Sequence, residues 1–141
     1  MDADYEKWER ACREIRKENE KLLDGFSDWL KGKGLGDKTV GKHLYNVDLY
    51  INHYLLYYDA TPAKDGAAHA GGFFGEWFIR KAMWASESSI KQTAAGLKKF
   101  YRYMYEAGLV EDLDLLYLQD TLKERMPDWL AAVRRYNEEC W

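Results

Sequence analysis

Side chains that can do catalytic chemistry occur in this sequence, but they lack the spacings of the common catalytic motifs. It contains no G-x-S-x-G nucleophile elbow, no glycine-rich loop followed by Lys-Ser or Lys-Thr, and no H-E-x-x-H pair. Adjacent carboxylates occur at Glu111-Asp112 and Glu138-Glu139, but acidic residues near helix ends are ordinarily solvated charges. The sequence therefore predicts that the protein has no catalytic residues and is not an enzyme.

The ligands that metals and cofactors use are scattered along the chain. The two cysteines, Cys12 and Cys140, lie at opposite ends, and His43, His53 and His69 are not in the spacing of a zinc site. We therefore expect reduced thiols, no metal and no cofactor.

A clearer pattern is electrostatic. The formal net charge is −3, but it is divided unevenly along the chain. Residues 1–30 carry six basic and nine acidic side chains, residues 31–107 carry eleven and seven, and residues 108–141 carry four and eight. The centre is thus basic and both flanks are acidic, and a basic region is the usual footprint of a nucleic-acid partner.

Helical geometry places the basic residues of this central region on defined faces. At about 100° of rotation per residue, Lys91, Lys98, Lys99 and Arg102 share one sector opposite an apolar face. By the same rule Lys38 and Lys42 lie opposite another apolar face, with Thr39 and His43 to the side. Such groups near helix N-termini hold phosphates and reach base edges. The alternative is that lysine and arginine simply occupy the solvent face of any amphipathic helix.

These residues require helices to position them. Apolar residues recur at helical spacing over residues 4–30, 37–58, 72–84 and 86–107. Glycines at 32, 34, 36 and 108 interrupt the pattern, and residues 59–72 have the composition of a loop. The sequence predicts an all-α fold, a compact bundle of five to six helices in a single domain over residues 1–141.

Several details of these helices are also predicted. Asp37 is expected to be the N-cap of the second helix, and Ser89 with Gln92 has the spacing of a capping box. The third helix, over residues 72–84, is apolar nearly all round and should be the most buried element. Asn19 lies on the apolar stripe of the first helix, where we expect an exposed edge rather than a role in register.

The tail is expected to contain two helical segments. An apolar set precedes Pro127, and Pro127 should open a last helix with a second apolar set. The predicted apolar residues of the tail are Leu113, Leu116, Leu122, Met126, Trp129, Leu130, Val133 and Tyr136.

Two runs of this sequence resemble a known family. Residues 26–50 are similar to the start of the SAM-like core-binding domain of phage integrases and other tyrosine recombinases. They read F-x-x-W-L-K-G-K-G-L-G-D-K-T-V-G-K-H-L-Y-N-V-D-L-Y. Residues 88–110 are similar to the second signature of that domain and read S-S-I-K-Q-T-A-A-G-L-K-K-F-Y-R-Y-M-Y-E-A-G-L-V. The resemblance covers residues 26–110, leaving residues 1–25 as an extension of the first helix and residues 111–141 as an acidic helical tail.

In that family a four-helix bundle grips duplex DNA, and a separate C-terminal domain cuts it. The resemblance implies an integrase core-binding type of bundle and a DNA face. No His-x-x-Arg precedes Arg134-Arg135-Tyr136, so Tyr136 is not expected to be a surviving nucleophile. We therefore expect a non-catalytic DNA-binding module, accessory to DNA recombination or integration. Its DNA-contacting residues, from the charge pattern and the resemblance together, would be Lys38, Thr39, Lys42, His43, Ser89, Lys91, Gln92, Lys98, Lys99 and Arg102.

A second function is left open by the composition. Tyrosines are dense over residues 45–58 and 101–105, and an integrase-like bundle could use an aromatic surface, with Tyr50, Tyr57 or Tyr103 exposed, to bind another protein or itself. The amino terminus lacks the basic start and apolar run of a signal peptide, and no eighteen apolar residues run together. The sequence thus predicts a cytoplasmic protein that has no membrane partner.

Overall fold

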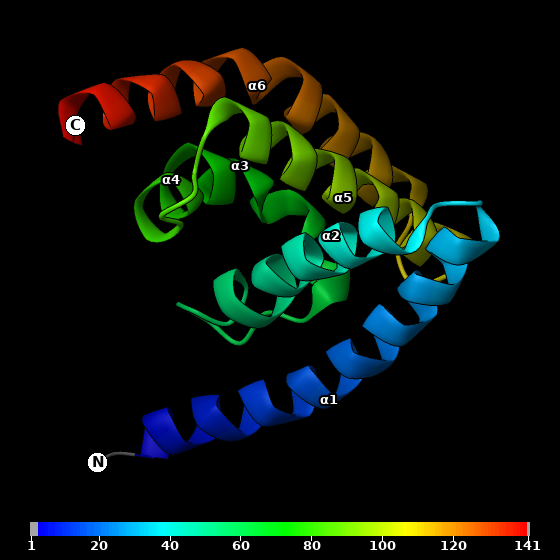
Figure 1. Cartoon of the computed structure of the whole chain (residues 1–141). Coiled ribbons are helices and arrows are strands. Elements are labelled where there is room, and N and C mark those ends of the chain that lie inside the picture. The colour runs from blue at the N-terminus through cyan, green and yellow to red at the C-terminus, as the bar shows by residue number, and fades with distance from the viewer. Residues whose placement is uncertain (1–2, 141) are drawn as a thin grey trace. The chain divides into compact units, whose positions relative to one another are not determined.

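The computed structural model describes residues 3–140, apart from the side chain of Cys140. Every regular element in that range is helical, so the predicted all-α fold class is confirmed (Figure 1). The chain divides into two compact units, Met1–Gly66 and Ala67–Trp141.

The first unit is built on a hairpin of two helices. α1 spans Ala3–Gly32 and α2 spans Asp37–Asp48. Gly34, at φ 87°, ends α1, and the amide of Leu35 donates to the carbonyl of Leu30 at 3.3 Å, the bond that identifies a Schellman motif. The N-cap of α2 is Gly36 and not the predicted Asp37, whose carboxylate instead lies in the positively polarised first turn.

The second predicted helix does not stay α-helical to residue 58. After α2 the chain continues as a π-helical segment, η1, over Leu49–Tyr54. Asn19 of α1 is 1% exposed, and its Nδ2 donates to the carbonyl oxygen of Ile51 at 3.2 Å and to Oδ1 of Asn52 at 2.8 Å. The expectation of an exposed edge at Asn19 is therefore wrong: this side chain joins α1 to η1.

The end of the first unit folds back on η1. After a turn the chain forms a short 3₁₀ segment, η2, at Ala63–Asp65. The hydroxyl of the buried Tyr50 donates to the carbonyl oxygen of Gly66 at 2.6 Å, which holds the last residue of the unit against the π-helical segment.

The second unit begins with a broken helical segment around an aromatic core. A 3₁₀ turn, η3, at Ala67–His69 leads into α3 at Ala70–Gly72, the π-helical η4 at Phe73–Trp77 and α4 at Phe78–Lys81. Phe73, Phe74 and Phe78 are fully buried. The prediction of a buried element is correct here, but the predicted helix ends at Lys81, and Met83 and Trp84 lie outside it on the surface.

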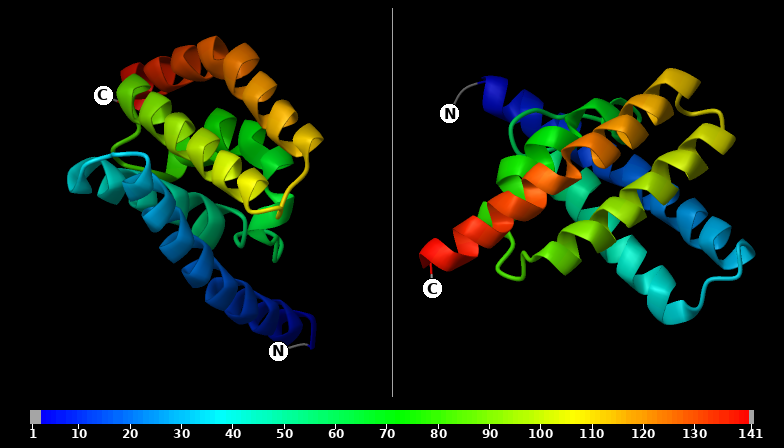
Figure 2. Two further views of the ribbon diagram at one scale, coloured as in Figure 1. Left: turned by 90° about the vertical axis from the view of Figure 1, so that its right-hand side faces the viewer. Right: turned by 90° about the horizontal axis from the view of Figure 1, so that it is seen from above.

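The remaining chain of the second unit forms a hairpin of long helices, α5 at Glu87–Glu106 and α6 at Asp112–Cys140 (Figure 2). Ser86 is the N-cap of α5, and its capping box closes with Ser89 rather than joining Ser89 to Gln92 as predicted. Gly108, at φ 75°, ends the helix as predicted, with the amide of Leu109 donating to the carbonyl of Met104 at 2.9 Å.

The tail differs from its prediction in two ways. Pro127 lies inside α6 instead of opening a new helix, and Figure 1 shows α6 as one continuous helix that bends along its course. The buried face of α6 is also shifted in its first turns, because Leu113 and Leu116 are 75% and 52% exposed and Leu115 and Leu118 are buried in their place. Of the other predicted residues, Leu122, Trp129 and Val133 are buried as expected.

Candidate nucleic-acid interface

Four basic residues of α5, which we call the α5 basic stripe, lie where the sequence predicts them. Lys91, Lys98 and Arg102 are exposed, and Lys99 is half-buried. The opposite side of α5 is buried and includes Ile90, Leu97, Phe100 and Tyr101. The apolar face therefore turns the four cations away from the core of the unit.

The two acidic residues of α5, Glu87 and Glu106, lie at its ends. No acidic residue lies between Glu87 and Glu106, so the exposed side of this helix is cationic over three turns. Glu87 is already bound, because Nη2 of Arg134 on α6 donates to its Oε1 at 3.0 Å. That hydrogen bond lowers the pKa of the Glu87 carboxyl below its ordinary value and raises the pKa of Arg134.

The two uncharged candidates on α5 differ in what they can do. The Ser89 hydroxyl belongs to the capping box and also donates to the carbonyl oxygen of Trp84 at 3.2 Å, so it positions the helix start. Gln92 is exposed, and its Nε2 donates to Oγ of Ser88 at 3.2 Å. The exposed Ala95 lies between Lys91 and Lys98 and leaves the middle of the stripe sterically open. Gln92 can therefore reach a ligand, whereas Ser89 acts through the backbone.

The candidates on α2 form a smaller group in the first unit, described here by itself. Lys38, Thr39 and Lys42 are exposed, whereas His43 is half-buried. Gly41 lies on the same exposed side, one turn from Lys38, and a Cβ added there would meet nothing within 4 Å. The chain thus has no packing reason for a glycine in this helix, and its small surface lets another molecule approach the backbone between the two lysines.

The alternative aromatic surface is only partly present. Tyr50 is fully buried, so the expectation that it could be exposed is wrong, and Tyr103 is half-buried. Tyr45, Tyr57 and Tyr58 remain exposed, at 57%, 48% and 71%.

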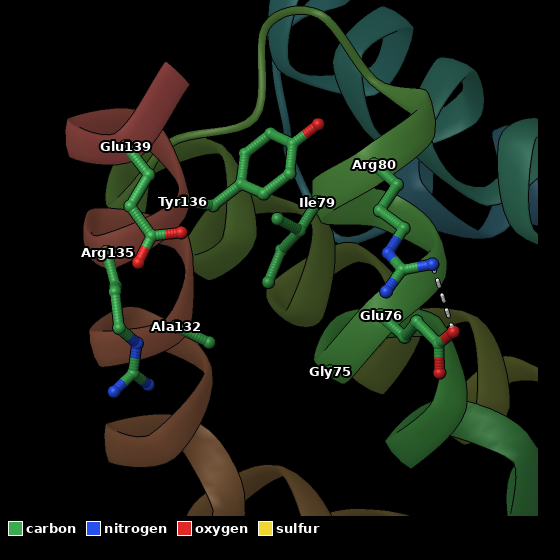
Figure 3. Close-up of a pocket in the computed structure, with 8 residues that line it drawn as sticks. All are labelled: Gly75, Glu76, Ile79, Arg80, Ala132, Arg135, Tyr136 and Glu139. Atoms are coloured by element: carbon green, nitrogen blue, oxygen red, sulfur yellow. Dashed lines mark ion pairs between the residues drawn. The ribbon is translucent and has the colours of Figure 1, made fainter. Parts of the chain in front are cut away.

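The second unit also contains a surface hollow (Figure 3). It lies between α4 with η4 on one side and α6 on the other, with Ile79 and Tyr136 among its lining residues. Its charged residues are two arginines and two glutamates, and Nη1 of Arg80 lies 3.6 Å from Oε1 of Glu76, the pair joined by the dashed line in Figure 3. Because its charges balance, this hollow has no preference for an anion or a cation.

Sequence reasoning placed Met83 and Trp84 in a buried helix, but they form an exposed loop before α5. Met83 is 99% exposed and Trp84 is 47% exposed. A signal was present in the sequence: if Ser86 is the N-cap of α5, the chain must leave the preceding helix and adopt extended backbone before that residue.

Within residues 3–140, the side chain of Cys140 excepted, no group of three or more His, Cys, Asp or Glu residues could hold a metal ion. None of the helices described is both long and apolar enough to span a bilayer. Comparison with known proteins found no family model, no curated sequence and no solved structure that matches this chain.

Proposed function

We propose that this protein is a non-catalytic module that binds duplex DNA through the α5 basic stripe. The observation that supports the proposal is the run of four cations, three of them exposed, without an intervening acid, held on one side of a helix by a buried apolar face. Phosphate neutralisation by lysine and arginine supplies most of the affinity of such interfaces.

The dimensions of the stripe suit a nucleic-acid backbone. At a rise of about 1.5 Å per residue, Lys91 and Arg102 are separated by roughly 16 Å along the helix axis. Successive phosphates of one DNA strand are about 3.4 Å apart along the duplex axis, so the stripe spans several phosphates. Ala95 gives the backbone room to approach, and Gln92 offers both a donor and an acceptor near the start of the helix.

The finer assignment rests on the resemblance of residues 26–50 and 88–110 to the core-binding domain of tyrosine recombinases. On that basis we assign the bundle to the integrase core-binding type and the protein to a cytoplasmic role accessory to DNA recombination or integration. The α2 group, with Lys38, Thr39 and Lys42, then supplies additional phosphate contacts.

Charge reversal tests the role of the α5 stripe. The double variant Lys98→Glu/Lys99→Glu should lose affinity for a fluorescein-labelled 25-base-pair duplex by at least about tenfold at 50 mM salt, because each lost phosphate contact weakens binding at low salt. Fluorescence anisotropy measures the affinity, and circular dichroism checks that the helical content is unchanged.

The matched control is Lys17→Glu/Lys21→Glu on α1, which makes the same charge change at two exposed lysines outside both candidate groups. Equal losses in the two double variants would mean that only the net charge matters, and the α5 assignment would be wrong. Failure of the wild-type chain to bind at 50 mM salt would overturn the DNA proposal as a whole.

A protein-binding module is the second candidate, and the exposed Tyr45, Tyr57 and Tyr58 favour it. Tyrosine is enriched at the centres of protein interfaces because it buries a large ring and keeps a polar tip. This candidate predicts that Tyr58→Ala weakens self-association or partner binding, whereas Lys98→Glu/Lys99→Glu leaves it unchanged.

A further inference from the structure

The loop between α4 and α5, residues 82–85, exposes an apolar side chain that nothing in the described chain covers. Met83 is 99% exposed, which is the largest exposure of any large apolar residue in the described chain. Trp84 beside it is half covered and has its ring in an edge-on contact with Phe78, at 6.4 Å between centroids. The tryptophan therefore anchors the loop, whereas the methionine projects from it.

This loop is held firmly although it is exposed. The amide of Ala85 donates to the carbonyl oxygen of Ala82 at 3.0 Å, closing a tight turn around Met83 and Trp84. Nδ2 of Asn137 on α6 donates to the carbonyl oxygen of Ala85 at 3.2 Å, and the Ser89 hydroxyl donates to the carbonyl oxygen of Trp84. Contacts from α5 and α6 thus fix the backbone that follows the projecting methionine before any partner arrives.

The sequence on either side of the loop is rich in basic residues. Between Glu76 and Glu106 the sequence contains six basic residues and a single acidic residue, Glu87. Glu87 is bound to Arg134, and the loop runs directly into the capped start of α5. Met83 therefore precedes, within the same unit, the helix that carries the α5 basic stripe.

We propose that Met83 is a wedge that inserts between base pairs of the duplex bound by the α5 basic stripe and kinks it. Apolar side chains, methionine among them, act in this way in minor-groove and architectural DNA-binding proteins, where partial unstacking bends the duplex by roughly 20–90°. The proposal rests on the proposed function, because the stripe must first hold the DNA. It adds that binding deforms the DNA and that a single side chain determines the deformation.

A lipid surface is the other polyanion to which an apolar loop flanked by basic residues could bind. Membrane attachment grows with the apolar area that enters the bilayer and usually involves several large side chains or a lipid chain. Here one methionine projects and its tryptophan neighbour is held against Phe78. A single wedge is enough to open one base step, so the observations favour DNA.

The experiment uses the full chain and a 20-base-pair duplex that carries a donor dye at one end and an acceptor dye at the other. Anisotropy of the same duplex establishes saturation independently of bending. The wild-type protein should raise the energy-transfer efficiency at saturation, because a kink brings the ends closer together. Met83→Ala should still saturate the duplex but abolish the rise, whereas Met83→Leu, which keeps a large apolar side chain, should preserve it.

Leu113→Ala is the matched control, since it removes an apolar side chain that is 75% exposed but lies on α6, away from the loop. It should leave both binding and energy transfer unchanged. Binding of the wild-type chain without a rise, or an equal rise with Met83→Ala, would overturn the wedge while leaving the proposed function intact. Absence of binding would overturn both. Met83-dependent sedimentation with anionic phosphatidylglycerol vesicles, together with an unbent duplex, would assign the loop to a lipid surface instead.

Discussion

Asn19 shows how one polar side chain can determine the geometry of the first unit. A π-helical turn displaces backbone groups from the regular α-helical pattern, and the carbonyl oxygen of Ile51 in η1 accepts a hydrogen bond from Asn19. The same Nδ2 donates to Asn52, whose own Nδ2 donates to Asp48 at 2.7 Å. A chain of amides and a carboxylate therefore links α1, η1 and the end of α2.

Replacing Asn19 by alanine should destabilise the protein. The substitution removes both donated bonds and leaves a carbonyl oxygen desolvated, a loss of about 1–3 kcal/mol in the free energy of unfolding. Urea denaturation followed by circular dichroism measures the change. Glu20→Ala, at the exposed neighbouring position, is the control and should stay within about 0.5 kcal/mol of the wild type. A similarly small change for Asn19→Ala would show that these hydrogen bonds do not contribute to stability.

At the scale of the elements, two glycines have opposite roles. Gly108 ends α5 at φ 75°, a left-handed conformation that strains any residue with a Cβ. Gly41 lies inside α2 with helical backbone and open space where a Cβ would be. The same substitution at the two sites should therefore change stability in opposite directions.

Gly108→Ala should lower the free energy of unfolding by about 1–2 kcal/mol, because alanine is strained in the left-handed region. Gly41→Ala should raise it by about 0.5–1 kcal/mol, because alanine has the higher helix propensity. Thermal and urea denaturation of both variants provide the comparison. A Gly41→Ala variant that is more stable but binds DNA more weakly would show that the glycine serves the approach of the partner to α2. A destabilised Gly41→Ala variant would contradict the structure around α2.

At the scale of the whole molecule, the distribution of charge matters more than its sum. The net charge of −3 would disfavour a polyanion if it were spread evenly, but the acidic residues concentrate in residues 1–30 and 108–141. Exposed charges interact over about 10 Å at 0.1 M salt, so a phosphate at the α5 basic stripe responds mainly to the charges near that stripe. An acidic chain can therefore still present a basic binding element.

The salt dependence of DNA affinity should report how many cations take part. The logarithm of the association constant should fall linearly with the logarithm of the salt concentration. If only the four cations of the α5 basic stripe contact phosphates, the slope should be about −3.6. If Lys38 and Lys42 of α2 also contact phosphates, the slope should be about −5.4. Anisotropy titrations between about 50 and 200 mM salt give the slope. Lys38→Glu/Lys42→Glu would change the slope only in the second case, and a slope near zero would contradict phosphate binding altogether.

The sequence by itself determined the features that depend on local periodicity and backbone chemistry. Apolar spacing located the long helices, because one face of each must be buried. Gly34 and Gly108 marked helix ends, because only glycine adopts the left-handed C′ position without strain. The same periodicity placed the α5 cations on the exposed side, since the opposite side had to be the core.

Only the tertiary structure decided the features in which packing outweighs local preference. Pro127 removes an amide donor from α6, yet the helix continues through it, because Trp129 and Val133 beyond it are buried and Trp129 packs on Phe74 at 4.9 Å. Asn19 became a buried linker because a π-helical carbonyl distant in the sequence lies beside it. In each case the deciding partner is far away in the sequence or belongs to a neighbouring element, so periodicity alone could not reveal it.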